Sequence, residues 1–324
     1  MPEGNRERVA IWAGERQASM LQGMFDDGRL EPAAIGGEAV SIRQEATRLG
    51  VVFHDDPRSL AHADADATLI ADPDRVMPTD VLAAMVAEAE RARRPLLTLA
   101  PRPASIEESA ELLASTHLPT PVPTFRDLAA GRRLIDAGIA FETPSGAAIE
   151  CSGPEREAAL TGRLFDAFDL LSAWFGTPTH VDATATRPVG TPSSRPNRIM
   201  AIARFSDGRA ASVTAGTEVG RHVRMATLYG GGGRLQWNDG RVDWAGRDGE
   251  ILDRDSGDPD QRTDFTAELV ESIRTQVRIR AGVEPGRTSE ATIDLLATCE
   301  AVMLSARTGE PESVDAVRRM IGRV

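Results

Sequence analysis

The sequence contains no lysine, so all 37 of its basic residues are arginine. A lysine Schiff base, a phosphate-binding loop that needs lysine and a lysine general acid are therefore excluded. Arginine cannot replace lysine in such proton transfers, because a guanidinium group stays protonated at neutral pH. Acid–base chemistry in this chain must come from other side chains.

Cysteine is also scarce, with only Cys151 and Cys299 in 324 residues. They lie far apart and show no metal-ligand spacing, so we expect buried, reduced thiols in a cytoplasmic protein. The net charge of −12 argues against nucleic acid as a partner, because backbone binding needs a clustered cationic surface. No apolar run approaches about 20 residues and the first residues are charged, so we expect neither a membrane span nor a signal peptide.

The first 121 residues alternate short apolar runs with amphipathic stretches, a pattern typical of a parallel sheet covered by helices. The expected strands are 9–13, 32–35, 50–53, 67–71 and 95–99. The expected helices are 15–27, 38–49, 78–93 and 105–115. The last helix opens with Ser105 and Glu108, which match a capping box. Right-handed crossovers between such strands predict a doubly wound, Rossmann-like domain.

The pattern changes after the proline-rich run 118–123, which indicates a domain boundary at 121/122. Residues 122–324 predict an α+β domain with a large, mostly antiparallel open sheet flanked by helices. Its expected strands are 178–186, 198–205, 209–218, 222–229, 233–237 and 241–245. Its expected helices are 127–137, 155–175, 261–281 and 288–307.

Several segments, taken together and in order, resemble the Gfo/Idh/MocA family of glucose–fructose oxidoreductases and inositol dehydrogenases. They are 125–136, 170–178, 203–208, 228–235 and 301–311. The resemblance covers nearly the whole chain. It implies a Rossmann-like domain for NAD or NADP, a sugar-like or polyol substrate, and dimers or tetramers formed through the antiparallel sheet.

The positions that carry cofactor chemistry in this family are largely changed. Of the glycine fingerprint that brings a backbone close to a pyrophosphate, only Gly14 remains, and it could also serve only to end the strand. Glu15 adds a negative charge there, which Arg16 could partly offset. Glu38 could accept a ribose hydroxyl, or belong to a helix start, where acids are favoured. Pro73, after the fourth strand, is a further cofactor-binding position that the resemblance implies.

The Glu-Lys-Pro signature of the family follows the fifth strand, and only its proline remains here, as the cofactor-binding candidate Pro101. Leu99 and Ala100 replace the glutamate and the lysine to which the resemblance assigns substrate positioning and proton relay. Arg102 brings a cation nearby that could bind substrate, although it cannot act as a base. The resemblance also implies a substrate-binding role for Arg126.

The central helix of the family carries a histidine and, three residues later, an aspartate that face the nicotinamide. Counting back from Gly176 places Asp166 and Asp169 at these positions, so these two are the catalytic candidates. They share a helix face, and two close carboxylates could form an acid–base pair, bind a cation or hydrogen-bond a substrate. Arg163, one turn earlier, could bind substrate or neutralise both carboxylates in a structural network.

Three functions stay open at this point. The first is a degenerate family member that no longer transfers hydride and acts as a ligand-binding or partner subunit, alone or with an intact homologue. The second is an active NAD(P)-dependent oxidoreductase of a sugar or polyol. The third is a repurposed, metal-assisted lyase or hydrolase. The loss of the signature residues favours the first.

Overall fold

The computed structural model describes residues 6–26, 28–73, 77–101, 118–141, 144–155, 157–187, 196–238, 240–255, 264–284 and 286–321. The chain forms two compact units: Met1–Pro123 with Phe265–Thr292, and Thr124–Asp264 with Ile293–Arg323. We call them the first and the second unit. The chain passes between them at 123/124, 264/265 and 292/293. Helix α8 (Phe265–Arg280), which the sequence placed with the second domain, lies in the first unit.

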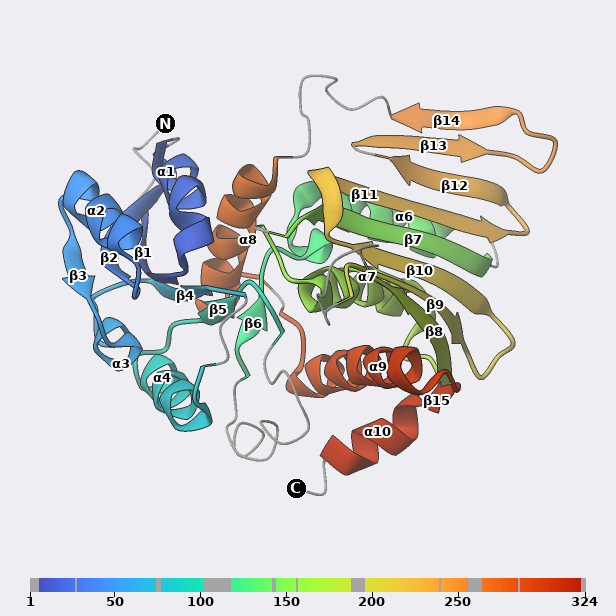
Figure 1. Ribbon diagram of the computed structural model, residues 1–324. Coiled ribbons are helices and arrows are strands. Elements are labelled where there is room, and N and C mark those ends of the chain that lie inside the picture. Colours follow the sequence, from blue (N-terminus) through green and yellow to red (C-terminus); the bar gives the residue numbers. More distant parts are fainter. Residues whose placement is uncertain are drawn as a thin grey trace. The chain divides into compact units, whose positions relative to one another are not determined.

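The first unit is built on a six-stranded sheet with the spatial order β3-β2-β1-β4-β5-β6, in which every pair is parallel (Figure 1). Its strands are β1 (Glu7–Ala13), β2 (Leu30–Gly36), β3 (Val52–His54), β4 (Ala67–Ala71), β5 (Leu96–Thr98) and β6 (Thr120–Pro121). This is the strand order of doubly wound dinucleotide-binding folds, so the predicted Rossmann-like sheet is confirmed. The short strand β6 was not predicted.

Burial explains why the central strands read as apolar runs in the sequence. All residues of β4 and the last five of β1 are buried, as expected for parallel strands that are covered on both faces. The helical elements of this unit are η1 (Glu15–Gln17), α1 (Ala18–Asp26), α2 (Val40–Leu49), α3 (Pro57–Leu60), α4 (Thr79–Arg91) and α8. Helices α3 and α4 pack on the sheet face that carries Trp12 and Ile70, while α8 packs on α1. The predicted helix 105–115 lies outside the described residues.

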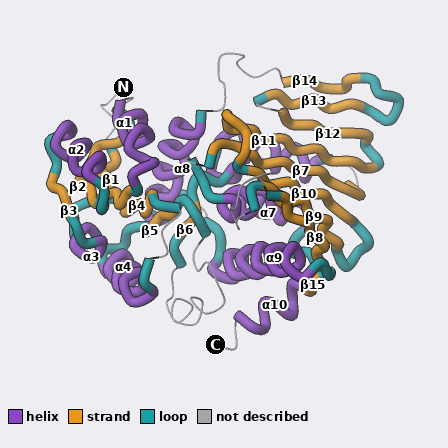
Figure 2. The backbone as a smooth tube through the Cα atoms, in the orientation of Figure 1, coloured by secondary structure: helices purple, strands orange, loops and turns teal. Residues whose placement is uncertain are grey.

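The second unit is built on a nine-stranded sheet with the order β14-β13-β12-β11-β7-β10-β9-β8-β15 (Figure 2). Its pairs are antiparallel except for β7 with β10, so the predicted large, mostly antiparallel sheet is confirmed. The strands are β7 (Pro144–Pro154), β8 (His180–Thr186), β9 (Arg198–Arg204), β10 (Ala210–Gly216), β11 (Glu218–Gly230), β12 (Gly233–Asn238), β13 (Arg241–Ala245), β14 (Ile251–Asp255) and β15 (Glu312–Ser313).

The central strand β7 was not expected from the sequence. Its residues, PSGAAIECSGP, are mostly Gly, Ser, Pro and Ala, which have low β propensity. Pairing on both sides makes it a strand nevertheless, since Cys151 lies opposite Arg224 of β11 and Ala215 of β10. Strand β7 therefore carries Cys151 into the middle of the unit.

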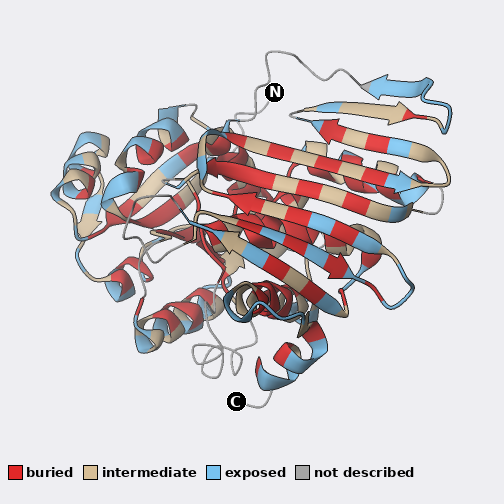
Figure 3. Cartoon of the chain, turned by 45° about the vertical axis from the view of Figure 1, so that its right-hand side comes forward, coloured by how far each residue is buried: buried red, intermediate tan, exposed pale blue. Residues whose placement is uncertain are grey.

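The two faces of this sheet differ, as the alternating bands along its strands show (Figure 3). In β9, Ile199, Ala201 and Ala203 are buried on one face, while Met200 and Ile202 on the other face are each 44% exposed. Helix α7 (Leu160–Phe175) packs on β7 and β10, and α6 (Ala129–Ala140) packs on α7. The remaining helical elements of the unit are η2 (Phe125–Asp127), α9 (Ser289–Thr308) from Ile293 onward, and α10 (Val314–Ile321).

Within the described ranges, no helix combines the length and the apolar character that crossing a bilayer requires.

Candidate functional site

Helix α7 is the buried centre of the second unit, yet it carries three charged side chains. Arg163, Asp166 and Asp169 are only 3%, 5% and 0% exposed. A buried charge is strongly unfavourable unless a partner compensates it. The partners of these three side chains therefore decide what the helix can do.

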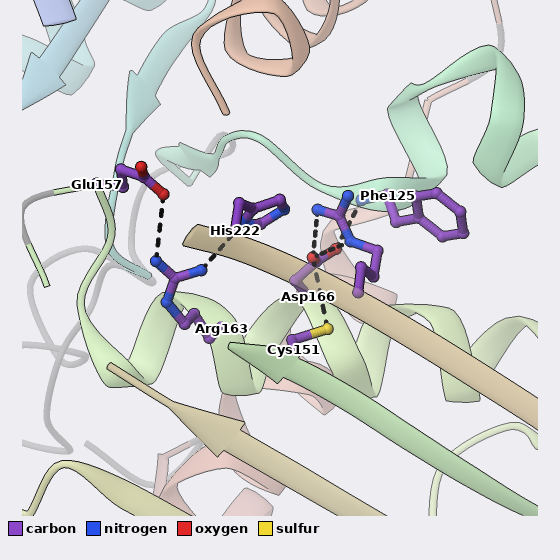
Figure 4. A network of polar contacts seen from close by, with 7 residues as sticks. Phe125, Cys151, Glu157, Arg163, Asp166 and His222 are labelled. Atoms are coloured by element: carbon purple, nitrogen blue, oxygen red, sulfur yellow. Dashed lines mark hydrogen bonds and ion pairs between the residues drawn. The ribbon is translucent and has the colours of Figure 1, made fainter. Parts of the chain in front are cut away.

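Asp166 is held by three residues from outside its helix (Figure 4). Its Oδ2 accepts hydrogen bonds from Nε and Nη2 of Arg224 at 2.9 and 2.7 Å, and its Oδ1 accepts one from the backbone N–H of Phe125 at 2.6 Å. The thiol of Cys151 lies 3.8 Å from Oδ2. The carboxylate thus ties α7 to β11, to β7 and to the turn η2.

Arg224 is the cation that neutralises Asp166, and it is itself only 1% exposed. Its guanidinium also stacks on the ring of Phe125, 4.7 Å from the centroid. The thiol of Cys151 completes this cluster. Burial, together with the nearby carboxylate of Asp166, raises the pKa of Cys151 far above its ordinary value, so the thiol stays protonated.

Arg163 takes different partners, in the other half of the network (Figure 4). Its Nη1 lies 3.1 Å from Nδ1 of His222, and its Nη2 donates to the carbonyl of Pro154 at 2.9 Å and lies 3.7 Å from a carboxylate oxygen of Glu157. Because a guanidinium only donates hydrogen bonds, Nδ1 of His222 is the acceptor and the ring proton sits on Nε2. A Cβ on Gly153 would lie within 2.7 Å of this guanidinium, so a larger residue there would require Arg163 to shift.

Asp169 is buried one turn further along α7 and faces a cation that reaches solvent. Nη1 of Arg126 lies 3.4 Å from Oδ1 of Asp169, and the side chain of Arg126 is 38% exposed. The two aspartates therefore have separate cationic partners, Arg224 and Arg126. Arg163, which the sequence offered as a partner for both, is placed beside His222 and Glu157 instead.

Sequence reasoning did not identify Arg224 as part of this site, although a signal was present. The positions His222, Arg224, Ala226 and Leu228 alternate along β11, and all four are buried. An arginine at an inward-facing position of an alternating strand predicts a buried anion close by. The sequence pattern does not say which of the acidic residues that anion is.

The cofactor-binding candidates belong to the first unit. Gly14 follows β1, Pro73 follows β4 and Pro101 follows β5, so the three meet at the carboxyl edge of the parallel sheet, where doubly wound folds bind ligands. Glu38 is exposed in the connection between β2 and α2. Arg102 lies outside the described residues.

Arg16 is exposed in the 3-10 turn η1, next to Glu15. Among the described residues of both units, no group of three or more His, Cys, Asp or Glu side chains is placed to hold a metal ion.

Solved structures show which proteins share this fold. GenD2 from gentamicin A biosynthesis, solved with NAD, matches with a TM-score of 0.71 and 15% identity over 97% of this chain and 99% of its own. Levoglucosan dehydrogenase, solved with NADH and levoglucosan, matches with a TM-score of 0.71 and 14% identity over 96% of this chain and 100% of its own. A putative myo-inositol dehydrogenase from Sinorhizobium meliloti matches with a TM-score of 0.67 and 15% identity over 95% of this chain and 99% of its own.

This is the fold of the Gfo/Idh/MocA dehydrogenases. The resemblance found in the sequence is thereby confirmed at the level of the Gfo/Idh/MocA fold. No protein-family model matches the sequence, and no curated protein does. At about 15% identity the likeness establishes the fold, and the chemistry of this chain has to be argued from its own residues.

Proposed function

We propose that this chain has lost hydride transfer and acts as a ligand-binding or partner subunit built on the Gfo/Idh/MocA fold. The state of Asp166 carries the proposal, because Asp166 occupies the position at which the resemblance places the histidine of the family. Both of its oxygens already accept hydrogen bonds, from Arg224 and from a backbone N–H. If Asp166 accepted a proton from a substrate, it would lose the charge that compensates a guanidinium only 1% exposed.

The position of the family's lysine supports the same proposal. Oxidation of an alcohol releases a proton, which a neighbouring side chain has to accept. Leu99 and Ala100 stand at the positions of the glutamate and the lysine of the Glu-Lys-Pro signature. Both are buried apolar residues, 2% and 7% exposed. No lysine elsewhere in the sequence can substitute.

The ligand that we propose is sugar-like. Neighbouring structures of levoglucosan dehydrogenase hold levoglucosan or L-sorbose. In this chain, Arg126 combines a contact to buried Asp169 with a partly exposed guanidinium, which can donate hydrogen bonds to hydroxyl groups. Arg126 would then hold the ligand, and buried Asp169 would position its guanidinium.

The test compares binding with turnover on the purified chain. Thermal melting with levoglucosan, sorbose and myo-inositol should show stabilisation by at least one of them, while incubation with NAD or NADP forms no reduced nucleotide. Arg126→Gln should abolish the stabilisation, and Arg319→Gln, which removes an exposed guanidinium on α10, should leave it unchanged. Sugar-dependent reduction of NAD by the wild type would contradict the proposal.

The exposed face of the second sheet suggests how the subunit assembles. Met200, Ile202 and Tyr229 are 44–46% exposed on its strands, and burial against another chain would remove these apolar groups from water. We propose a homo-oligomer, or a pair with an intact homologue, in the cytoplasm. Light scattering should give a particle larger than 34.7 kDa, and Ile202→Arg should reduce it to that mass. A wild-type particle of 34.7 kDa would exclude the homo-oligomer.

A second candidate is an active NAD-dependent oxidoreductase. The structures solved with NAD or NADH favour it. It would require a proton acceptor other than a lysine or the Asp166 carboxylate.

A further inference from the structure

Gly14 is the one residue of a dinucleotide fingerprint that this chain keeps. In the pattern G-x-G-x-x-G, the second glycine has no side chain, so that a pyrophosphate can approach its backbone. Gly14 directly follows β1, so the glycine-rich turn would run through η1 (Glu15–Gln17). Glu15 and Arg16 are exposed there, whereas the side chain of Gln17 is only 2% exposed.

The space beside Gly14 is filled by side chains of the same unit. A Cβ built on Gly14 would lie 2.7 Å from Oε1 of Gln17 and 2.8 Å from Oδ1 of Asp72. Asp72 reaches this place because it directly follows β4, the parallel neighbour of β1. The N–H of Gly14 is also engaged, since it points to the carbonyl of Ala71 at 3.4 Å. The room that the missing Cβ leaves is therefore taken up by oxygen atoms of the chain itself.

The charge at this edge is wrong for a pyrophosphate as well. Asp72 places a carboxylate against Gly14, and Glu15 adds a second one in the first turn of η1. Carboxylate and phosphate oxygens are both hydrogen-bond acceptors and both negative, so they repel each other at contact distance. Among the described residues next to Gly14, Arg16 supplies a positive charge against these two.

The ribose-binding acid, for which Glu38 is the candidate, does not stand at the end of β2. A dinucleotide-binding domain carries an acidic residue about 20 positions after the fingerprint to hydrogen-bond the ribose. Here β2 ends at Gly36, which pairs with Trp12 of β1. A Cβ on Gly36 would lie 2.7 Å from Cε3 of the indole and 2.9 Å from the carbonyl oxygen of His54. An acidic side chain at Gly36 would thus require Trp12 to move.

The carboxyl edge of the parallel sheet around Gly14 is called the dinucleotide edge. We propose that its own side chains close this edge, with Asp72 and Gln17 in the place of a pyrophosphate. NAD(H) and NADP(H) then do not fit this chain as cofactors, although its fold is that of dinucleotide-dependent enzymes. The inference rests on the first unit alone. It concerns binding, whereas the loss of a proton acceptor in the second unit concerns turnover.

The experiment removes the side chains that close the dinucleotide edge and measures NADH binding by calorimetry. The wild type should bind with a dissociation constant on the order of 1 mM or weaker. The double variant Gln17→Ala/Asp72→Ala should bind at least tenfold more tightly, because it removes both blocking side chains and one negative charge. Asp64→Asn is the matched control: it removes an exposed carboxylate that precedes β4, at the opposite edge of the same sheet, and should leave binding unchanged.

Circular dichroism establishes that each variant is folded before it is titrated. If the double variant does not fold, Asp72→Asn, which keeps the shape and removes only the charge, should still tighten NADH binding severalfold. A low-micromolar constant for the wild type, or a folded opened variant without tighter binding, would overturn the proposal. Tighter NADH binding by the double variant leaves the proposed function intact, because that function rests on the missing proton acceptor of the second unit, which the titration does not measure.

Discussion

The ion pair of Asp166 and Arg224 gives the sharpest prediction for the second unit. Asp166→Asn keeps the shape of the side chain but removes the charge that compensates a guanidinium only 1% exposed. The amide could still accept the backbone N–H now bound at 2.6 Å, yet its NH2 group would then face two donors of Arg224. Removing one partner of a buried pair typically destabilises by about 3–5 kcal/mol.

Urea unfolding followed by circular dichroism measures this loss. Since 1 kcal/mol shifts the melting temperature of 150–250 residues by roughly 2–4 °C, melting should fall by roughly 6–20 °C. Asp315→Asn, which removes a 70% exposed partner of Arg319, is the control and should destabilise by less than about 1 kcal/mol.

The double variant Asp166→Leu/Arg224→Met tests whether the loss comes from the unpaired charge. Two apolar side chains in place of a buried ion pair are often neutral or stabilising, so the double variant should recover much of the loss. If Asp166→Asn is as stable as the wild type, or if the double variant is no better than Asp166→Asn, the reasoning is wrong.

Three further predictions concern two cysteines, a glycine and a glutamate. Burial raises the pKa of Cys151 and of Cys299, so a thiol reagent should label neither in the native protein and both after denaturation; native labelling of either would contradict their burial. Gly131→Ala should destabilise by about 1–3 kcal/mol in urea unfolding, because its Cβ would overlap a backbone carbonyl of η2, whereas Gly220→Ala meets nothing within 4 Å and should be neutral. Burial raises the pKa of Glu300 above 4.5, so its ionisation lowers stability as pH rises through that pKa. Glu300→Gln should therefore stabilise more at about pH 7 than at about pH 4, and an equal effect at both would refute this.

The elements that could be read from the sequence are those whose burial leaves a local pattern. Strands β1 and β4 are covered on both faces and appear as continuous apolar runs, while β9 and β10 alternate because one face is exposed. Strand β7 left no such pattern, since its Gly, Ser and Ala residues become a strand only through their neighbours. Helix α8 was recognised as a helix, but its place in the first unit depends on contacts with α1, which its own sequence does not encode.

The candidate site shows the same division between local and distant information. The helix face that carries Asp166 and Asp169 follows from helical spacing and could be predicted. Their partners could not, because Arg224 is 58 residues and Arg126 is 43 residues away along the chain. In the first unit, the loss of the glycines was visible in the sequence. That Asp72 fills the space beside Gly14 follows only from the parallel pairing of β1 with β4.

Calorimetric titration of the wild-type chain with NADH and with NADPH tests the closed dinucleotide edge most directly. Closure by Asp72 and Gln17 predicts that neither nucleotide binds more tightly than on the order of 1 mM, about −4 kcal/mol. A dissociation constant in the low micromolar range for either nucleotide would contradict closure and would restore the active oxidoreductase as the leading function.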